Sequence, residues 1–542
     1  MNFVDPFYGL ALIVLLLSYW HYGRFQPAVA NAPADAGAAT PPDPNSLAPT
    51  TLRLRGWILL AASLVFYAFF QIQYIPLLLG IATLNFWLGK TMAARSRGSL
   101  QTHYAYLSNQ EWEEVQRLWN ARATRLLSLG IALNILLLVS FKYIPFLLRT
   151  TAGFFGILQL APLADWLRQQ VALPLSDSLI APLGISFFTF ECVAYLVDVY
   201  RGAPPARDWL DFTSYKLFFP KLISGPITRY HPFTTQLSSS HRPQTELFAE
   251  GLWLFACGAF KKVLIADQLG IFVDLCFGAG NLERAGSLDL WLAVLAYGLQ
   301  LFFDFSGYVD MARGTAMLLG VNLPENFDFP YFTTSIASFW RRWHMTLGDW
   351  LRNYLYFPLG GSRRGLRRTC INLTVIMAIA GIWHGAAWGF VIWGLLHGLA
   401  LVAHRLTDYY SQQDPELAAW WRSVPGSLSA WLLTQVFVFF AWIFFRLPDL
   451  KQATLLLRHS FLYAGDVQFA QKVYTEALGL GRPELIWLLL GLMAAMAIAF
   501  GLHRGLRLQL TWHLKLMLVP LCFLAVWLLA PEGGTSYIYF DF

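Results

Sequence analysis

The sequence predicts an all-α protein that crosses a membrane many times. Hydrophobic residues make up 56% of its 542 residues and charged residues 13%, against about 25% charged in soluble domains. Mean hydropathy is +0.48. About 11 apolar runs approach the roughly 20 residues that a helix needs to cross a bilayer, and we expect some to be re-entrant or split in two. They lie near residues 7–23, 56–72, 74–93, 125–148, 180–199, 251–277, 288–303, 372–403, 431–446, 484–502 and 514–530.

The first run is followed by Ala28-Val29-Ala30, which resembles a signal-peptide cleavage site. However, Met1 to Pro6 contains no Lys or Arg, and Arg24 interrupts the approach to the site. We therefore expect this run to be retained as a first membrane span. Residues 31–48, rich in Ala, Pro and Asp, predict a mobile loop.

The positions of basic residues predict the orientation. Arginines flank the first loop and recur through the segment 94–124, so the positive-inside rule places both on the cytoplasmic side. The uncharged turn near Gln73 is then external, and the N-terminus is predicted to be periplasmic. Segment 94–124 also mixes apolar and charged residues at helical spacing, which predicts an amphipathic interfacial helix. No solenoid repeat or separate soluble domain is visible, so residues 1–542 are predicted to form one membrane domain.

An excess of arginine lies between residues 340 and 368. The only acid there is Asp349, and the seven arginines are Arg341, Arg342, Arg352, Arg363, Arg364, Arg367 and Arg368. The positive-inside rule accounts for the last four. Arg341 and Arg342 instead lie among Phe339, Trp340 and Trp343, where their charges need phosphate or carboxylate partners. A basic cluster of this kind suits an anionic, phosphate-bearing donor.

Two histidines lie at unusual places. No Asp, Glu, Lys or Arg occurs from Thr369 to His404, and His384 lies inside this run. An ionisable residue at membrane depth indicates function, although a hydrogen-bonding role between helices is the alternative. Burial disfavours the imidazolium and leaves a neutral base near physiological pH. His344, in the aromatic and arginine block, is a second candidate.

Other polar residues carry weaker signals. Asp304 and Ser306 follow the apolar run 299–303, so they are expected either to line a membrane-embedded tunnel or to stabilise helix packing. Lys261 and Lys262 are expected to snorkel to the interface. The five cysteines are isolated and show no metal-binding or disulfide spacing. No metal site and no nucleic-acid partner are therefore expected.

Three motifs carry a resemblance to a known family. They run from Phe339 to His344, from Trp350 to Gly361, and through Gly381-Ile382-Trp383-His384-Gly385. Supporting matches are residues 183–190, 198–201, 220–227, 304–312 and 537–542. Together these resemble the membrane-bound O-acyltransferases, in the bacterial branch that includes alginate O-acetyltransferase. The resemblance is strongest over residues 180–400, which are predicted to form the catalytic core.

The resemblance implies a fold of about 11 membrane helices, with re-entrant and interfacial helices around a central tunnel. By this resemblance His384 is the catalytic histidine. His344 matches a second family position, earlier in the sequence, that holds His, Asn or Asp. Arg341, Arg342, Trp340, Trp383, Asp304 and Ser306 are the expected donor-binding or substrate-binding residues. His344 and Asp349 have the spacing of the His-x4-Asp pattern of soluble glycerolipid acyltransferases. However, family relatives often have Ser at the position of Asp349, and a separation of five residues in a helix points the two side chains in different directions. We therefore assign Asp349 no role.

The implied function is O-acetylation of an extracellular polysaccharide such as alginate from the bacterial inner membrane. The expected donor is cytoplasmic acetyl-CoA with no bound cofactor. A separate periplasmic acetyltransferase partner and membrane lipids are the other expected contacts. The alternatives are acyl or D-alanyl transfer to teichoic acid, peptidoglycan, lipid or protein, and a histidine-dependent transporter or flippase. A transporter is expected to show inverted repeats, which the sequence does not display.

Overall fold

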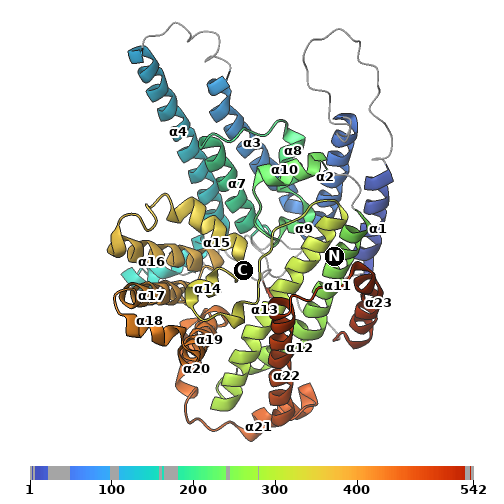
Figure 1. Cartoon of the computed structure of the whole chain (residues 1–542), viewed down its shortest axis with the longest axis vertical. Helices are drawn as coiled ribbons and strands as arrows, with labels where there is room; N and C mark the ends of the chain where they lie inside the picture. The colour runs from blue at the N-terminus through green and yellow to red at the C-terminus, as the bar shows by residue number, and fades with distance from the viewer. Residues whose placement is uncertain are drawn as a thin grey trace. The chain divides into compact units, whose positions relative to one another are not determined.

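A computed structural model describes residues 3, 6–21, 49–97, 109–157, 162–163, 181–239, 244–278, 280–531 and 537–538. These residues form helices and loops, with no β-strand among them (Figure 1). The predicted loop 31–48 lies outside the described residues. Contacts divide the chain into two compact units, residues 1–252 with 312–324 and residues 253–311 with 325–542. The assignment of one domain to the whole chain stays a prediction.

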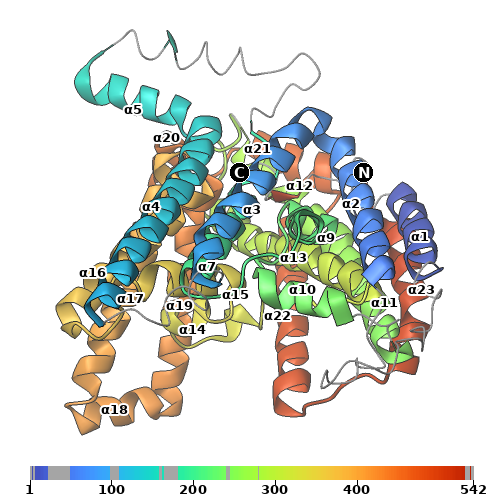
Figure 2. The same cartoon turned by 90° about the horizontal axis from the view of Figure 1, so that it is seen from above.

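The first unit contains a group of long helices and several short ones. Its α3 and α4 both pack along α7, as Figure 2 also shows. The helices are α1 (Pro6–His21), α2 (Pro49–Gln71), η1 (Ile72–Tyr74), α3 (Ile75–Arg97), α4 (Asn109–Lys142), α5 (Ile144–Phe155), α7 (Ile185–Tyr200), α8 (Trp209–Lys216), α9 (Phe219–Leu222), α10 (Tyr230–Ser239) and the first half of α11 (Thr245–Phe260).

Helix α4 joins two elements that the sequence separated. The described part of the interfacial segment, from Asn109 to residue 124, continues without a break into the apolar run that follows, giving one helix of 34 residues. That run was expected to reach residue 148, but α4 ends at Lys142. Pro145 then lies in the first turn of α5, where its missing N–H is tolerated because first-turn amides have no intrahelical acceptor.

Close packing in the first unit explains two of the supporting motifs. Gly184 has φ of +75°, and a Cβ there would collide with the carbonyl oxygen of Leu222. Gly225 approaches the backbone of Lys221 just as closely. Only glycine provides both the backbone conformation and the space at residue 184. Segments 183–190 and 220–227 are therefore pressed together in the core of this unit.

The second unit holds the remaining helices. They are the second half of α11, the π-helix η2 (Lys261–Ala266), α12 (Asp267–Phe277), α13 (Ser287–Leu318, to Met311), η3 (Pro330–Phe332), α14 (Ile336–Trp340), α15 (Met345–Leu351), the π-helix η4 (Arg352–Tyr356), α16 (Gly365–His384), α17 (Trp388–Ser411), α18 (Pro415–Arg422), α19 (Val424–Arg446), α20 (Leu450–His459), α21 (Val467–Ala470), the π-helix η5 (Gln471–Leu478), α22 (Arg482–Phe500), the π-helix η6 (Gly501–Gly505) and α23 (Trp512–Leu529).

The apolar run 372–403 is two helices, α16 and α17, separated by residues 385–387. They lie side by side in Figures 1 and 2. A Cβ on Gly381 would collide with the carbonyl of Phe390, and one on Gly394 with the carbonyl of Met377. These glycines allow two helix backbones to touch, as small residues do in membrane bundles. His384 consequently lies at the end of a helix rather than in the middle of one.

Eight stretches of the described residues are long and apolar enough to cross a membrane. The first, Arg53–Ala93, contains most of α2 and of α3, and two shorter apolar helices cover Phe7–His21 and Ile144–Phe155. The chain is therefore an all-α, multi-pass membrane protein, as predicted.

Candidate active site

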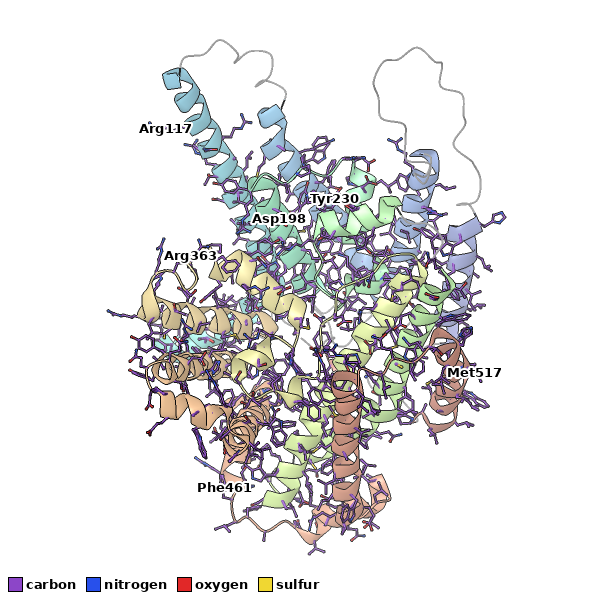
Figure 3. The ribbon with its side chains drawn as sticks, in the orientation of Figure 1. Arg117, Asp198, Tyr230, Arg363, Phe461 and Met517 are labelled. Carbon is purple, nitrogen blue, oxygen red and sulfur yellow. The ribbon has the colours of Figure 1, made fainter. Side chains whose placement is uncertain are left out.

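Two of the family-like motifs, residues 339–344 and 381–385, come together in the second unit at Trp383, and residues 350–361 pack on α16 through Asn372. The two motifs that contain Arg341 to Gly361 fold as short helices and turns, and the third ends α16. In the turn after η4, Gly360 and Gly361 both have positive φ, a conformation that glycine adopts without strain. Figure 3 labels Arg363 in the basic loop that precedes α16.

His384 is enclosed by aromatic rings. Its side chain is 4% exposed, and its ring centroid lies 4.9 Å from Trp383, 5.1 Å from Trp393 and 5.1 Å from Phe445. The neighbouring Gly385 has no room for a Cβ because the ring of Phe390 fills that space. The Trp-His-Gly sequence thus places an imidazole at a helix end inside an apolar, aromatic cage.

His344 lies beside the same tryptophan. Its ring is fully buried, 6.3 Å from Trp383 and 4.8 Å from Phe305 of α13. Its backbone has φ of +45° at the position that precedes α15, a left-handed conformation that is uncommon outside glycine and often found at functional sites. Trp383 therefore contacts both histidines, which are 40 residues apart in sequence.

Burial decides the protonation state of His344, which lies outside the candidate membrane spans. Desolvation lowers the pKa of His344 from its ordinary 6.5 to about 3. The ring is therefore neutral at physiological pH. A neutral imidazole can orient a substrate or accept a proton, but it does not contribute a positive charge.

A pH dependence of stability follows for His344. In the unfolded chain His344 takes up a proton as the pH falls below its ordinary pKa of 6.5, whereas in the folded chain it stays neutral down to about pH 3. Protonation of His344 therefore favours the unfolded chain. The unfolding free energy is highest above pH 6.5 and falls as the pH drops below that value. We expect the unfolding free energy of the wild type to fall more steeply below pH 6.5 than that of His344→Asn, by up to about 1.4 kcal/mol per pH unit. Asparagine tolerates the left-handed backbone. Equal slopes in detergent unfolding between pH 7.5 and 5 would contradict this.

The two neighbouring arginines have different surroundings. Arg342 lies 3.9 Å from the carboxylate of Asp328, which also pairs with Arg504. Arg341 is exposed and forms no ion pair with any described residue. The sequence suggested phosphate or carboxylate partners for these arginines. Arg342 has a carboxylate partner, and Arg341 has none among the described residues, so Arg341 can bind an anion.

Trp340 makes a contact that spacing could not reveal. Its indole N–H donates a 3.2 Å hydrogen bond to Nδ1 of His397, which is 57 residues away and fully buried. This bond places the proton of His397 on Nε2. His397 thus fixes the orientation of Trp340 from the second helix of the α16–α17 hairpin.

Asp304 belongs to a buried ionic cluster. One carboxylate oxygen accepts a 2.6 Å hydrogen bond from Lys262, and the other accepts a 3.0 Å bond from the backbone N–H of Ile538. Lys262 also pairs with Asp267 at 2.8 Å. Lys262 was expected to reach the interface, but it is only 2% exposed. Of the two roles expected for Asp304, these contacts favour stabilising helix packing over lining a tunnel.

Ser306 and Asp349 complete the set of residues considered. Ser306 is 3% exposed, and its hydroxyl has no hydrogen-bond partner among the described residues. Asp349 is exposed and pairs with Arg352 at 2.5 Å. The structure thus brings His344, His384, Trp383 and Trp340 into one aromatic cluster, and it gives Asp304 a separate ionic network. No cluster of three or more metal-ligating residues occurs within the described ranges.

The sequence matches known proteins. A sequence model described as the membrane-bound O-acyltransferase family matches residues 206–447, which include both histidines. The probable alginate O-acetylase AlgI of Pseudomonas putida is 35% identical over 80% of this chain and 80% of its own length. The peptidoglycan O-acetyltransferase of Helicobacter pylori is 35% identical over 74% of this chain and 72% of its own length.

A more distant relative covers less of the chain. The teichoic acid D-alanyltransferase of Streptococcus thermophilus is 31% identical over 42% of this chain and 57% of its own length. The long matches, the family model and the multi-pass helical architecture agree with one another. The chain therefore belongs to the membrane-bound O-acyltransferase family and is an O-acyltransferase.

Proposed function

We propose that this enzyme moves acetyl groups from cytoplasmic acetyl-CoA across the bacterial inner membrane for O-acetylation of an extracellular polysaccharide such as alginate. The observation that carries the proposal is the buried aromatic cluster in which Trp383 contacts both His384 and His344. Two imidazoles in such an environment have no need of a metal to perform acid–base chemistry at neutral pH.

In the proposed reaction, His384 acts as general base on the acceptor hydroxyl. As the imidazole accepts the hydroxyl proton, the oxygen attacks the thioester carbonyl and forms the new C–O bond. The tetrahedral intermediate then breaks its C–S bond, and the CoA thiolate leaves and takes up the proton from the imidazolium. His344, neutral because it is buried, orients the thioester or the acceptor by hydrogen bonding.

The donor is proposed to approach from the basic side. Arg341 is exposed and has no carboxylate partner in the described part of the chain, so it is suited to a phosphate of CoA. The loop with Arg363 and Arg364 adds positive charge before α16. Trp340, held by His397, and Trp383 are proposed to pack against the donor. Ser306 is proposed as an additional polar contact and Asp304 as a residue that positions α13.

The acceptor side is proposed to be periplasmic, with a separate periplasmic acetyltransferase completing transfer to the polymer and with the N-terminus on that side. Alginate is favoured because several relatives at 35–36% identity are described as probable alginate O-acetylases. Peptidoglycan is the second candidate acceptor, since the Helicobacter pylori relative is equally similar.

Reconstitution tests the function directly. Purified protein in lipid nanodiscs is given acetyl-CoA labelled in the acetyl group, and release of CoA and transfer of label to alginate or peptidoglycan oligosaccharides are measured with and without the periplasmic partner. Transfer to alginate supports the proposal, and transfer only to peptidoglycan redirects the acceptor. Absence of CoA release with every acceptor, or use of D-alanyl donors alone, would contradict acetyl transfer.

The Arg341→Ala variant is expected to raise the KM for acetyl-CoA about tenfold with little change in kcat. The reason is that one charge-assisted hydrogen bond to phosphate, of about 1.5 kcal/mol, is lost from binding. Arg458→Ala, which removes another exposed arginine of the same unit, is the control. An unchanged KM for Arg341→Ala, or an equal rise in both variants, would remove Arg341 from the donor site.

A further inference from the structure

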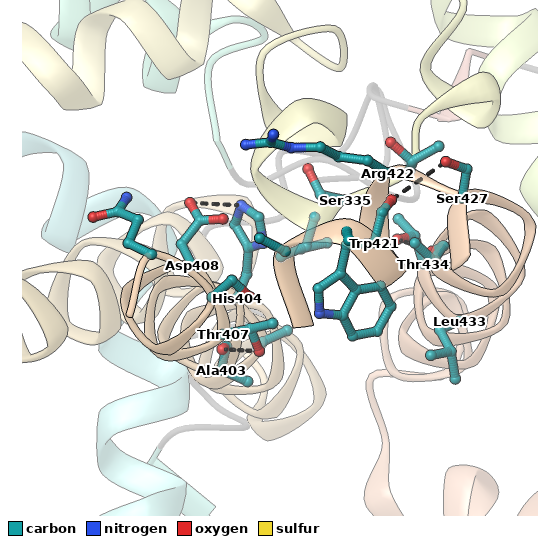
Figure 4. A pocket seen from close by; sticks show the side chains of 18 of the residues that line it. Ser335, Ala403, His404, Thr407, Asp408, Trp421, Arg422, Ser427, Leu433 and Thr434 are labelled. Atoms are coloured by element: carbon teal, nitrogen blue, oxygen red, sulfur yellow. Dashed lines mark hydrogen bonds and ion pairs between the residues drawn. The ribbon is translucent and has the colours of Figure 1, made fainter. Parts of the chain in front are cut away.

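A pocket of about 1020 Å³ lies in the second unit, and no residue of the candidate active site lines it. It is formed by residues 334–336, the C-terminal half of α17, the short helix α18 and the N-terminal half of α19 (Figure 4). Both α17 and α19 are candidate membrane spans. The pocket therefore lies between two spans, at the end where α18 connects them.

One part of the pocket is apolar. Its walls there come from the facing sides of α17 and α19, and the small residues leave a groove between the two helices. The residues are Ala400, Ala403, Ala430, Leu433 and Phe437. A groove of this kind between membrane spans accommodates a hydrocarbon chain, which is as apolar as the groove itself.

The other part of the pocket presents hydrogen-bond donors. Arg422 is exposed and forms no ion pair with any described residue. The indole nitrogen of Trp421 and the hydroxyl oxygen of Ser411 are buried and have no hydrogen-bond partner in the described ranges. Arginine and the indole N–H only donate. These donors have no acceptor at this end of the pocket, and an anionic acceptor would suit them best.

Several other polar groups of the pocket are already engaged. Asp408 lies 3.8 Å from His404, as the dashed line in Figure 4 marks. The hydroxyl of Ser427 bonds to the carbonyl of Trp421 at 3.4 Å, and that of Thr407 to the carbonyl of Ala403 at 3.0 Å. The carboxylate of Asp408 is about half exposed, so its charge is partly screened by solvent. Arg422, Trp421 and Ser411 therefore remain to hold an anionic ligand, and the side chains of Gln412 and Thr334, which also line the pocket, are exposed to solvent.

The pocket lies at the end of α17 that the charge pattern assigns to the cytoplasmic side. Gly398 packs against Thr374 and Gly394 against Gly381, so α17 runs antiparallel to α16. The end of α17 that lines the pocket lies on the same side as the basic loop before α16, which the positive-inside rule assigns to the cytoplasm. The cytoplasmic leaflet supplies anionic phospholipids, and tryptophans such as Trp420 and Trp421 favour the headgroup level.

We propose that this pocket binds a glycerophospholipid of the inner leaflet, with its phosphate diester on Arg422, Trp421 and Ser411 and an acyl chain in the groove between α17 and α19. The apolar groove and the unpaired donors are combined in one pocket, and an amphiphile with an anionic head satisfies both. The site is separate from the acyl-transfer chemistry, so it stands or fails independently of the proposed function.

Native mass spectrometry of the full chain, released from detergent after titration with phosphatidylglycerol, tests the site. We expect one tightly bound lipid in the wild type and at least about tenfold weaker binding in Arg422→Ala, because a charge-assisted bond to the phosphate is lost. Ala403→Phe, which fills the groove, should also weaken binding. Arg458→Ala, with its exposed arginine outside the pocket, should bind like the wild type.

Competition distinguishes a lipid from a soluble phosphate compound. Inorganic phosphate and CoA, each added at millimolar concentration, are expected to leave the bound lipid in place. Displacement of the lipid by CoA would overturn the lipid assignment in favour of a soluble phosphate ligand. Unchanged lipid binding in both Arg422→Ala and Ala403→Phe would overturn the site. The melting temperature of each variant is the control for folding and should equal that of the wild type.

Discussion

Replacement of His384 by alanine is expected to reduce acetyl transfer by about 10²–10⁴-fold, the usual contribution of a general base. The substitution removes the imidazole from the aromatic cage of Trp383, Trp393 and Phe445. CoA release from labelled acetyl-CoA, measured at saturating donor and acceptor, reports the effect on kcat. The loss should appear in kcat rather than in KM for acetyl-CoA, because the base acts in the chemical step.

A second variant separates catalysis from packing. His384→Gln keeps a polar side chain of similar length but cannot accept and return a proton near neutral pH, so it should be as inactive as His384→Ala. Recovery of activity in the glutamine variant would assign His384 to hydrogen bonding between helices instead. His513→Ala, which removes an exposed histidine of α23, is the matched control and should retain activity.

Hydropathy located most of the candidate membrane spans, although the predicted runs 180–199 and 251–277 are not among them. It could not locate the break after His384. Residues 385–387 are Gly, Ala and Ala, which are as apolar as their surroundings, so no change in hydropathy marks the turn. The chain can fold back tightly there because the missing side chains of Gly381 and Gly394 let α16 and α17 touch. Such close approach is a property of two helices together, and one helix's sequence does not reveal it.

The candidate site residues could be named from the sequence, but their partners could not. The motif around His384 and the basic block around His344 were visible in the sequence, and the structure places both histidines against Trp383. The pairing of Lys262 with Asp304 was not, because 42 residues separate them. A lysine that follows an apolar helix looks the same in sequence whether it reaches the interface or a buried carboxylate.

Glu191 is the position in the first unit where substitution is expected to cost most stability. Its buried carboxylate accepts hydrogen bonds from Lys221 at 2.6 Å, from Lys216 at 3.1 Å and from the backbone N–H of Thr228 at 3.0 Å. Both lysines are at most 3% exposed. Glu191→Gln would leave two buried ammonium groups without an anion, so we expect a loss of about 3–5 kcal/mol in unfolding free energy.

The lysines supply the matched comparison. Lys221→Met removes one cation and leaves Glu191 with Lys216 as a balanced pair, so the loss should be clearly smaller than for Glu191→Gln. The double variant, Glu191→Gln with Lys221→Met, leaves one unpaired lysine instead of two and should be more stable than Glu191→Gln alone. Unfolding of the four proteins in the same detergent measures the order. The ammonium of Lys221 lies 4.0 Å from the ring centroid of Tyr215. If Lys221→Met lowered the unfolding free energy most, this contact would matter more than the balance of buried charges.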